Sequence, residues 1–487
     1  MDLVSWPTNR RLMKQNKGDE VGKDFKSKFL SDAEKAKLKL DTISPSMCMA
    51  KWKQVSLHLT TGMTNSCYHP PLHHIDASAV ATNPSALHNT AHKKQQRKMM
   101  LEGTRPPECS YCWAIEDQGK LSDRHYRSGE PWAIADFDKV TSQPWDQDIL
   151  PSYVEVNFNH NCNLKCSYCS PQYSTAWEKE SNEHGAWPTS TPHNDPAYFK
   201  GRRRPIPHRE HNPYVEAFWK WWPDLYPELK HFRMTGGEPM MDKNTYRVFD
   251  HVLANPKPDL HLNTTSNFCA DERLWIKYKD YVKRICDGEN VEHFMQYVSL
   301  DSFSDQAEYI RSGLDFNLLW DRVNQFLTEI PGRSSITFII TMTNLNVVGV
   351  QYLLAGIHGL RQIYSTDYQR VWFDTPLLRT PEWMRMDLLP ESYCHILDNL
   401  KTWMIKWQET PETRFKGFKD YEIQRMDRDI AWMRAGQKHD DKYLAKQKAD
   451  FYRYFTEHDK RRNTNFLKTF PKMETWWKEC ETYAKTR

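Results

Sequence analysis

The chain has 487 residues, a formal net charge of +4 and a mean hydropathy of −0.81. This length suffices for two or three domains with a large buried core. No apolar run approaches the 18 residues that a membrane-spanning helix needs, and the N-terminus lacks the apolar segment of a secretory signal, which predicts a cytoplasmic protein without a membrane partner. The mild charge and scattered basic runs give little support for nucleic acid as a partner.

Residues 1–45 are polar and include a lysine-rich amphipathic stretch, which predicts a tail or a leading helix. Residues 46–150 carry a first group of cysteines and many turn formers. From about residue 151 the pattern alternates between strands and helices. The strands are predicted at residues 153–158, 229–234, 259–267, 293–301, 334–344 and 370–376.

Six strands that alternate with helices predict parallel β/α units and therefore an α/β fold. Right-handed crossovers in sequential order favour a partial (β/α)6 barrel, with an open doubly wound sheet as the alternative. The remaining residues have helical spacing and many aromatics, which predicts a helical C-terminal layer. The predicted regions are a tail or leading helix (1–45), a cysteine-bearing module (46–150), a barrel (151–380) and a helical region (381–487).

The eleven cysteines are an odd number in a long chain without a signal, which argues against a disulfide framework and for metal or redox use. Cys162, Cys166 and Cys169 follow the first predicted strand with the spacing C-x3-C-x2-C. Three thiolates on one loop can hold three irons of a cubane cluster and leave the fourth iron open. Structural zinc is the alternative, since His160 would complete a set of three cysteines and one histidine, but the spacing favours iron–sulfur.

The sequence TGGEP follows the second predicted strand, and in β/α barrels ligands gather at the carboxyl ends of strands. Gly236 and Gly237 permit a close backbone approach there, and Glu238 supplies a carboxylate. Alone, this motif also fits a turn with a surface glutamate. After a three-cysteine loop it indicates a binding site.

The cysteine triplet and the GGE strand end together resemble the radical S-adenosylmethionine (radical SAM) superfamily, over roughly residues 150–380. The resemblance implies a [4Fe–4S] cluster on the three cysteines, with S-adenosylmethionine (SAM) bound at the open iron. It also implies that Tyr168, before the third cysteine, lies near the adenine. Gly236, Gly237 and Glu238 would contact the SAM amino group.

Later strand ends resemble the same family. Asn267 follows the third predicted strand in a TNG-like turn, and the residues from Ser299 to Gly313 resemble an SLD…YIRxG pattern. The resemblance implies four residues near the ribose and carboxylate of SAM: Ser299, Asp301, Arg311 and Thr341. By residue type alone, Arg311 also fits an ion pair with Glu308, and strand-end Ser and Thr often cap helices.

The upstream group comprises Cys48, Cys67, Cys109 and Cys112. On spacing alone, zinc and a second cubane fit this group equally well. Beside a radical SAM core it resembles the twitch and SPASM auxiliary-cluster domains, whose G-x4-C hallmark appears as Gly62 to Cys67. Further SPASM cysteines are absent, so the resemblance implies the twitch type with one auxiliary [4Fe–4S] cluster. In familiar members this module follows the barrel, whereas here it precedes it.

The resemblance implies an enzyme that cleaves SAM reductively and abstracts a hydrogen from its substrate, with peptide modification or dehydrogenation favoured. The implied partners are an electron donor such as flavodoxin or ferredoxin and a peptide or small-molecule substrate. The alternatives are a non-catalytic zinc or iron–sulfur protein that binds nucleic acid, and an RNA-modifying radical SAM enzyme. The sequence identifies neither the substrate nor a catalytic side chain.

Overall fold

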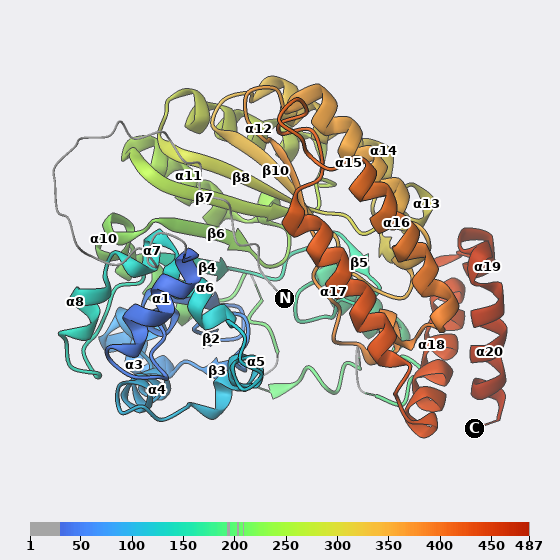
Figure 1. Ribbon diagram of the computed structural model, residues 1–487, viewed down its shortest axis with the longest axis horizontal. Helices are drawn as coiled ribbons and strands as arrows, with labels where there is room; N and C mark the ends of the chain where they lie inside the picture. Colours follow the sequence, from blue (N-terminus) through green and yellow to red (C-terminus); the bar gives the residue numbers. More distant parts are fainter. Residues whose placement is uncertain (1–29, 192–194, 202–203, 208, 487) are drawn as a thin grey trace. The chain divides into compact units, whose positions relative to one another are not determined.

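The computed structural model describes residues 30–191, 195–201, 204–207 and 209–486 (Figure 1). The chain divides into two compact units. Of the described residues, the barrel unit holds those from 157 to 211 and from 233 to 486, and the cysteine-rich unit holds residues 30–156 and 212–232. In the described part of the chain, no helix has both the length and the apolarity needed to cross a bilayer. The region boundaries drawn from the sequence stay a prediction.

The barrel unit contains a sheet whose strands follow one another in chain order, β6-β7-β8-β10-β11. They are β6 (His231–Thr235), β7 (Lys257–Ser266), β8 (Val291–Ser299), β10 (Ser334–Ile339) and β11 (Val371–Asp374). The β7–β8, β8–β10 and β10–β11 pairs are parallel. A doubly wound sheet reverses its strand order partway. The sequential order therefore confirms the predicted α/β winding of a partial barrel over the open alternative.

Helices between the strands cover one face of this sheet (Figure 1). They are α11 (Lys243–Ala254), α12 (Glu272–Asp287), α13 (Asp305–Ile310), α14 (Phe316–Glu329) and α15 (Val350–Tyr364). Phe249 of α11 and Phe326 of α14 both pack on Phe294 of β8, with ring centroids 6.2 and 6.4 Å apart. In α12, Asp271 caps the first turn and the buried Trp275, Tyr278, Val282 and Ile285 recur at helical spacing.

The other face of the sheet carries polar side chains, because neighbouring residues of a strand point to opposite faces. Arg233 of β6 donates from Nε and Nη2 to Thr265 Oγ1 of β7, at 3.1 and 3.0 Å. Its guanidinium lies 4.0 Å from the ring centroid of Tyr297 of β8. This polar face is the interior of the barrel-type winding.

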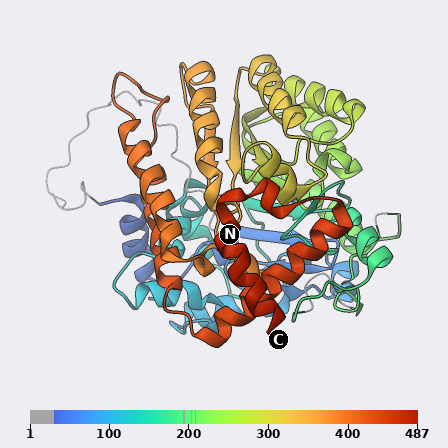
Figure 2. The same ribbon diagram turned by 90° about the vertical axis from the view of Figure 1, so that its right-hand side faces the viewer.

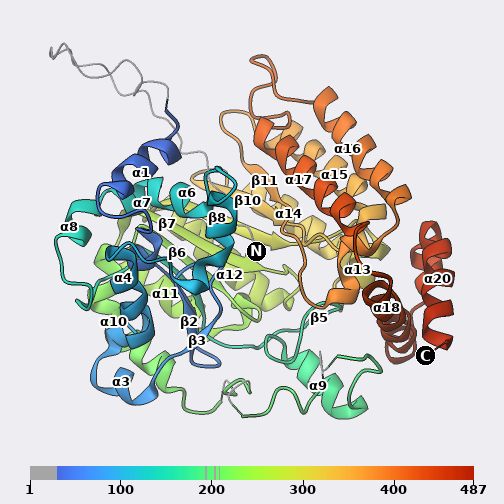
Figure 3. The same cartoon turned by 60° about the horizontal axis from the view of Figure 1, so that its bottom comes forward.

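From residue 378 to residue 486 the described chain forms helices and no strand, as predicted for the C-terminal layer. They are α16 (Cys394–Lys406), α17 (Asp420–Gly436), α18 (Asp441–Arg462), α19 (Phe466–Thr469) and α20 (Glu474–Lys485). α16 packs beside α17, as Figure 3 shows, and α18 beside α20, the two red helices of Figure 2. Phe451 contacts Trp476 across the second pair, with ring centroids 5.7 Å apart.

The cysteine-rich unit has strands in the order β4-β1-β2-β3. They are β1 (Gln54–His58), β2 (Met63–Asn65), β3 (His73–His74) and β4 (Tyr153–Asn157), whose last residue belongs to the barrel unit. The β1–β2 and β2–β3 pairs are antiparallel. Its helices are α1 (Asp32–Asp41), α2 (Ala50–Lys53), α3 (Ala77–Thr82), α4 (Ala91–Leu101), α5 (Ser110–Glu116), α6 (Asp123–Gly129), α7 (Pro131–Ile134), α8 (Phe137–Thr141) and α10 (Pro213–Glu228).

Candidate functional site

The three downstream cysteines lie on a loop that is tied to a distant segment of the barrel unit. β5 (Lys165–Cys166) pairs antiparallel with β9 (Arg311–Ser312), which places Cys166 opposite Arg311. The N–H of Ser167 adds a bond to the carbonyl of Ile310 at 2.7 Å. The loop that carries the triplet is therefore fixed by the YIRSG segment that the sequence also singles out.

Cys166 is buried, and Cys162 and Cys169 are half-buried. Burial raises the pKa of Cys162, Cys166 and Cys169, to about 12 for Cys169, and the two other thiols raise the pKa of Cys162 further. A metal binds thiolates, so cluster binding displaces these protons. Within the described ranges no three His, Cys, Asp or Glu side chains are placed as ligands of a single metal ion. A cubane takes one thiolate at each iron, and three converging thiols fit that donor set.

Two side chains donate hydrogen bonds to sulfur atoms of the triplet. Arg311 Nη1 lies 3.6 Å from Cys166 Sγ, and Asn267 Nδ2 lies 3.9 Å from Cys162 Sγ. Asn267 Nδ2 also donates to Asn163 Oδ1 at 2.9 Å. Hydrogen bonds to sulfur help to set the potential of an iron–sulfur cluster. Two residues predicted from later strand ends thus lie against the cysteine loop.

The two glycines of the GGE stretch let it pack directly on the start of the cysteine loop. A Cβ at Gly237 would lie 2.3 Å from the carbonyl oxygen of Asn161. Gly236 has φ +108°, a conformation that favours glycine. The N–H of Gly237 donates to the carbonyl of Asn159 at 3.1 Å, and that of Glu238 to the carbonyl of Asn161 at 2.6 Å. Close approach is therefore the local reason for both glycines.

Glu238 joins the ends of two strands. Its carboxylate is 1% exposed and accepts bonds from Ser266 Oγ at 2.7 Å, the N–H of Asn267 at 2.8 Å and the N–H of Met240 at 3.0 Å. Burial raises the pKa of Glu238 to about 6, while these hydrogen bonds act to lower it. The carboxylate thus ties the end of β6 to the end of β7, a role that the sequence did not predict.

Asp301 is the centre of a buried network just beyond β8. Its carboxylate accepts from Arg311 Nη2 at 3.0 Å, from the Tyr168 hydroxyl at 2.8 Å and from the N–H of Thr341 at 2.8 Å. It is also ion-paired with Arg311 Nε at 2.8 Å. Burial lowers the pKa of Arg311, but Asp301, Tyr168 and Cys166 together raise it more, so the net pKa lies well above its ordinary value. Four residues predicted separately therefore meet in one hydrogen-bonded group.

The alternative role for Arg311, an ion pair with Glu308, is wrong, because Arg311 is paired with Asp301. Glu308 instead accepts the N–H of Phe316 at 3.0 Å and caps α14. Ser299 is the last residue of β8, half-buried, on the strand face that carries Tyr297.

Two helices that the sequence did not connect with the cysteines hold the loop from outside. Glu180 of α9 (Thr175–His184) is ion-paired with Arg462 of α18 at 2.9 Å and with Lys165 at 2.7 Å. Arg462 Nη1 also donates to the carbonyl of Lys165 at 3.0 Å, and Tyr454 of α18 donates to the carbonyl of Ser167 at 2.8 Å. His160, the alternative fourth ligand, lies 3.3 Å from Glu178 of α9.

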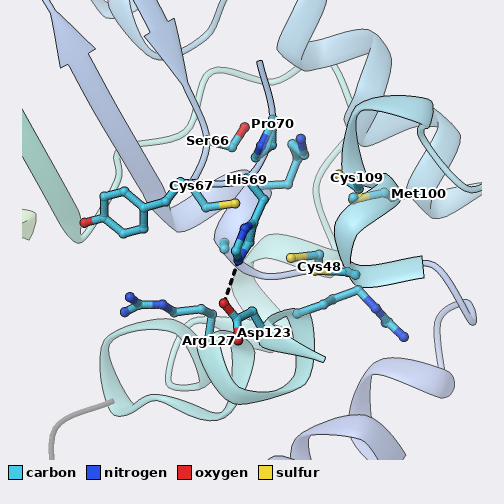
Figure 4. A pocket seen from close by; sticks show the side chains of 14 residues that line it. Cys48, Ser66, Cys67, His69, Pro70, Met100, Cys109, Asp123 and Arg127 are labelled. Carbon is cyan, nitrogen blue, oxygen red and sulfur yellow. Dashed lines mark hydrogen bonds and ion pairs between the residues drawn. The ribbon is translucent and has the colours of Figure 1, made fainter. Parts of the chain in front are cut away.

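The upstream cysteines line one cavity of the cysteine-rich unit (Figure 4). Cys48, Cys67, Cys109 and Cys112 all contribute to its wall. Burial raises the pKa of the Cys67 thiol to about 12 and that of Cys109 to about 11, and it also raises the pKa of Cys112. Cys48, Cys109 and Cys112 are buried and Cys67 is half-buried. Four thiols that line one cavity match in number and type the donors of a fully ligated cubane or of a four-thiolate zinc site, although as placed they do not form a site for a single metal ion.

Both backbone conformation and packing require a glycine at the first position of the G-x4-C motif. Gly62 has φ +62° in the turn between β1 and β2, and β2 leads directly to Cys67. A Cβ at Gly62 would lie 2.2 Å from the ring of Tyr214. Gly62 therefore permits the tight turn that joins β1 to β2, between Cys48 and Cys67.

Cationic side chains share this cavity with the thiols. Lys51, Arg124 and Arg127 line it, with Asp123 as the acidic side chain of the wall. Arg124 is paired through two bonds with Glu116, at 2.9 and 2.7 Å, and His69 is paired with Asp123 at 2.6 Å. Four thiolates around a metal centre leave it negatively charged, so these cations favour its binding.

No family model matches the sequence, and no curated protein counts as a relative. Among solved structures the chain is similar to native anSMEcpe with bound AdoMet, at TM-score 0.33 and 15% identity, over 54% of this chain and 62% of that one. It is also similar to Streptococcus suis SuiB bound to S-adenosylmethionine, at TM-score 0.33 and 12% identity, over 75% and 70%. SuiB bound to the precursor peptide SuiA gives TM-score 0.33 and 11% identity, over 73% and 69%. The chain spans under two thirds of the first structure. Because the TM-scores are this low, the function is argued below from the residues of the site and not from these similarities.

Proposed function

We propose that the chain is a radical SAM enzyme in which Cys162, Cys166 and Cys169 hold a [4Fe–4S] cluster with an open iron for SAM. The observation that carries the proposal is the ladder between β5 and β9, which brings the three-cysteine loop beside Arg311 and its partner Asp301. When bound, the cluster supplies one electron to SAM, whose carbon–sulfur bond breaks to give a radical that takes a hydrogen atom from the substrate.

The protein's own residues orient the ligand. Asp301 fixes the Arg311 guanidinium, so that one N–H stays directed at the Cys166 sulfur. The same carboxylate holds the Tyr168 hydroxyl and thereby the ring that we assign to the adenine side. We assign the SAM amino group to the backbone of the GGE stretch, which is hydrogen-bonded to the start of the cysteine loop.

The polar face of the barrel sheet is the surface that we assign to the substrate. Arg233, Thr265 and Tyr297 form a connected group on it. A substrate that gives up a hydrogen atom must be held in place while water is excluded, and packed polar side chains on a rigid sheet suit that task. We propose a peptide or a small molecule as the substrate and flavodoxin or ferredoxin as the electron donor. The solved SuiB structure bound to precursor peptide SuiA makes a peptide the first substrate to test.

We propose further that Cys48, Cys67, Cys109 and Cys112 hold an auxiliary [4Fe–4S] cluster. The shared cavity and the cationic side chains in its wall support a bound anionic centre. Zinc satisfies the same donors, so metal analysis has to separate the two.

The test is anaerobic reconstitution of the full chain with iron and sulfide, followed by iron and zinc analysis and by incubation with SAM and a reductant. We expect about eight irons per chain, and about four after Cys162, Cys166 and Cys169 are all replaced by alanine. We expect the unaltered chain to release 5′-deoxyadenosine and the triple variant to release none. A chain with intact clusters that leaves SAM uncleaved contradicts the proposal.

A further inference from the structure

Lys51 is a buried lysine of the cysteine-rich unit whose surroundings are the four upstream cysteines. It belongs to the four-residue helix α2, which begins two residues after Cys48. Its side chain is 2% exposed and lines the same cavity as all four thiols. Its ammonium is also ion-paired with Glu108, the residue next to Cys109. The lysine is therefore held at the wall of the site, where water does not screen its charge.

The charged neighbours of Lys51 include two of the cysteines, Cys109 and Cys67. Burial lowers the pKa of Lys51, but Cys109, Glu108 and Cys67 together raise it above the ordinary lysine value. Lys51 in turn lowers the pKa of Cys109, partly through a side-chain hydrogen bond, although burial raises that pKa more. The Lys51 ammonium therefore lies in the same cavity as the four thiols and near Cys109.

The other charges of the cavity are largely balanced by local partners. Arg124 is paired with Glu116, and Asp123 with His69. Arg127 lies over the rings of Tyr68 and Tyr153, at 5.7 and 5.9 Å. Glu108 divides its two oxygens between Lys51 and His92, the latter at 2.6 Å. Lys51 is thus an almost completely buried cation in the cavity wall that all four cysteines also line.

We infer that Lys51 raises the reduction potential of the auxiliary cluster and so makes this site an electron acceptor; the inference rests on the auxiliary cluster of the proposed function. Reduction adds one negative charge to a centre that four thiolates already make anionic. A fixed, desolvated cation stabilises the more negative state, and net charge and hydrogen bonds to sulfur are the main protein controls of cluster potential. The cluster would take one electron from the reduced flavodoxin or ferredoxin of the proposed function, which is oxidised by one electron, with no bond formed or broken.

The experiment uses the full chain with Cys162, Cys166 and Cys169 replaced by alanine, so that the auxiliary cluster is the one that is observed. Anaerobic redox titration monitored by electron paramagnetic resonance gives its potential. In this background we expect Lys51→Met to lower the ratio of reduced to oxidised cluster at a fixed potential by about tenfold, which equals about 59 mV for one electron. Glu108→Gln removes an anion beside Lys51, so its shift should have the opposite sign.

Lys53 provides the matched control, because it lies on the same helix and is also 2% exposed. Its Nζ contacts Asp136 at 2.6 Å and the carbonyl of Leu150 at 2.8 Å, away from the cavity wall. Lys53→Met should therefore move the potential far less than Lys51→Met. Lys51→Arg keeps the positive charge, so its reduction potential should stay close to that of the parent chain. This variant can be measured even if Lys51→Met does not fold.

Three results would overturn the inference. They are an unchanged potential in Lys51→Met, equal shifts in the Lys51 and Lys53 variants, and a site that holds zinc instead of iron. None of these affects the release of 5′-deoxyadenosine by the unaltered chain, so a failure here is distinguishable from a failure of the SAM-cleaving function.

Discussion

Glu180→Gln tests whether the outer contacts of the cysteine loop are electrostatic. The Glu180 side chain is 4% exposed and lies between Arg462 and Lys165. Burial raises its pKa, but the two cations lower it more, to about 2 from 4.5. A carboxylate whose pKa falls on folding stabilises the protein above its unfolded pKa, and this stabilisation is lost as the pH falls from 4.5 toward 2.

The magnitude follows from the pKa difference. A pKa unit corresponds to about 1.4 kcal/mol, so this carboxylate contributes about 3 kcal/mol to the free energy of unfolding at neutral pH. Glu180→Gln should lose most of that amount at about pH 7 and very little near pH 2. Glu178→Gln is the control, because Glu178 is 41% exposed and a pair of that kind is worth about 1 kcal/mol or less.

The assay is equilibrium unfolding in denaturant from about pH 7 to about pH 3, on iron-free protein so that acid does not destroy a cluster. Tryptophan fluorescence and far-ultraviolet circular dichroism should give coincident transitions before a free energy is extracted. We expect the curves of the parent chain and of Glu180→Gln to converge as the pH falls. A difference of constant size across this pH range would refute the electrostatic account of these contacts.

Gly237→Ala should destabilise the protein by about 1–3 kcal/mol, because its Cβ would meet the carbonyl of Asn161. Gly359→Ala, in the interior of α15 where nothing lies within 4 Å, should instead be neutral or gain up to about 1 kcal/mol; equal effects in thermal unfolding would contradict this reasoning. Arg311→Met and Asp301→Leu should each cost about 3–5 kcal/mol, since each leaves a buried partner uncompensated. In a double-mutant cycle the pair should couple by at least about 1 kcal/mol, and additive losses would count against the network.

The strands of the barrel unit were predictable because each is a short apolar run between helical segments. β8 and β11 lie within or close to the predicted 293–301 and 370–376. β10 ends at Ile339 although the predicted strand continues to residue 344, since beyond Ile339 only isolated backbone bonds such as that from the N–H of Met342 to the carbonyl of Pro376 continue the pairing. The hairpin of β1 and β2 was not predicted, because strands of five and three residues among turn formers give no clear alternation.

For the candidate site, residue types and strand ends predicted the members but not their partners. Asp301 and Arg311 were expected near a ligand, and their pairing with each other and with Tyr168 required the fold. Arg462 and Glu180 carry no local signal, since the two residues are 282 positions apart in the chain. Lys51 was overlooked for a different reason, because a lysine between two cysteines of a group is ordinarily a surface residue.

The ladder between β5 and β9 has a consequence for the order of events in the making of this protein. The segment that pairs with Cys166 comes 145 residues later, and the arginine that holds the carbonyl of Lys165 comes 297 residues later. During synthesis the three thiols therefore emerge long before the backbone that shapes their loop. We expect iron and sulfide to be retained firmly only after most of the chain has left the ribosome, so truncated chains that keep all three cysteines but lack α18 should lose iron more readily than the complete chain.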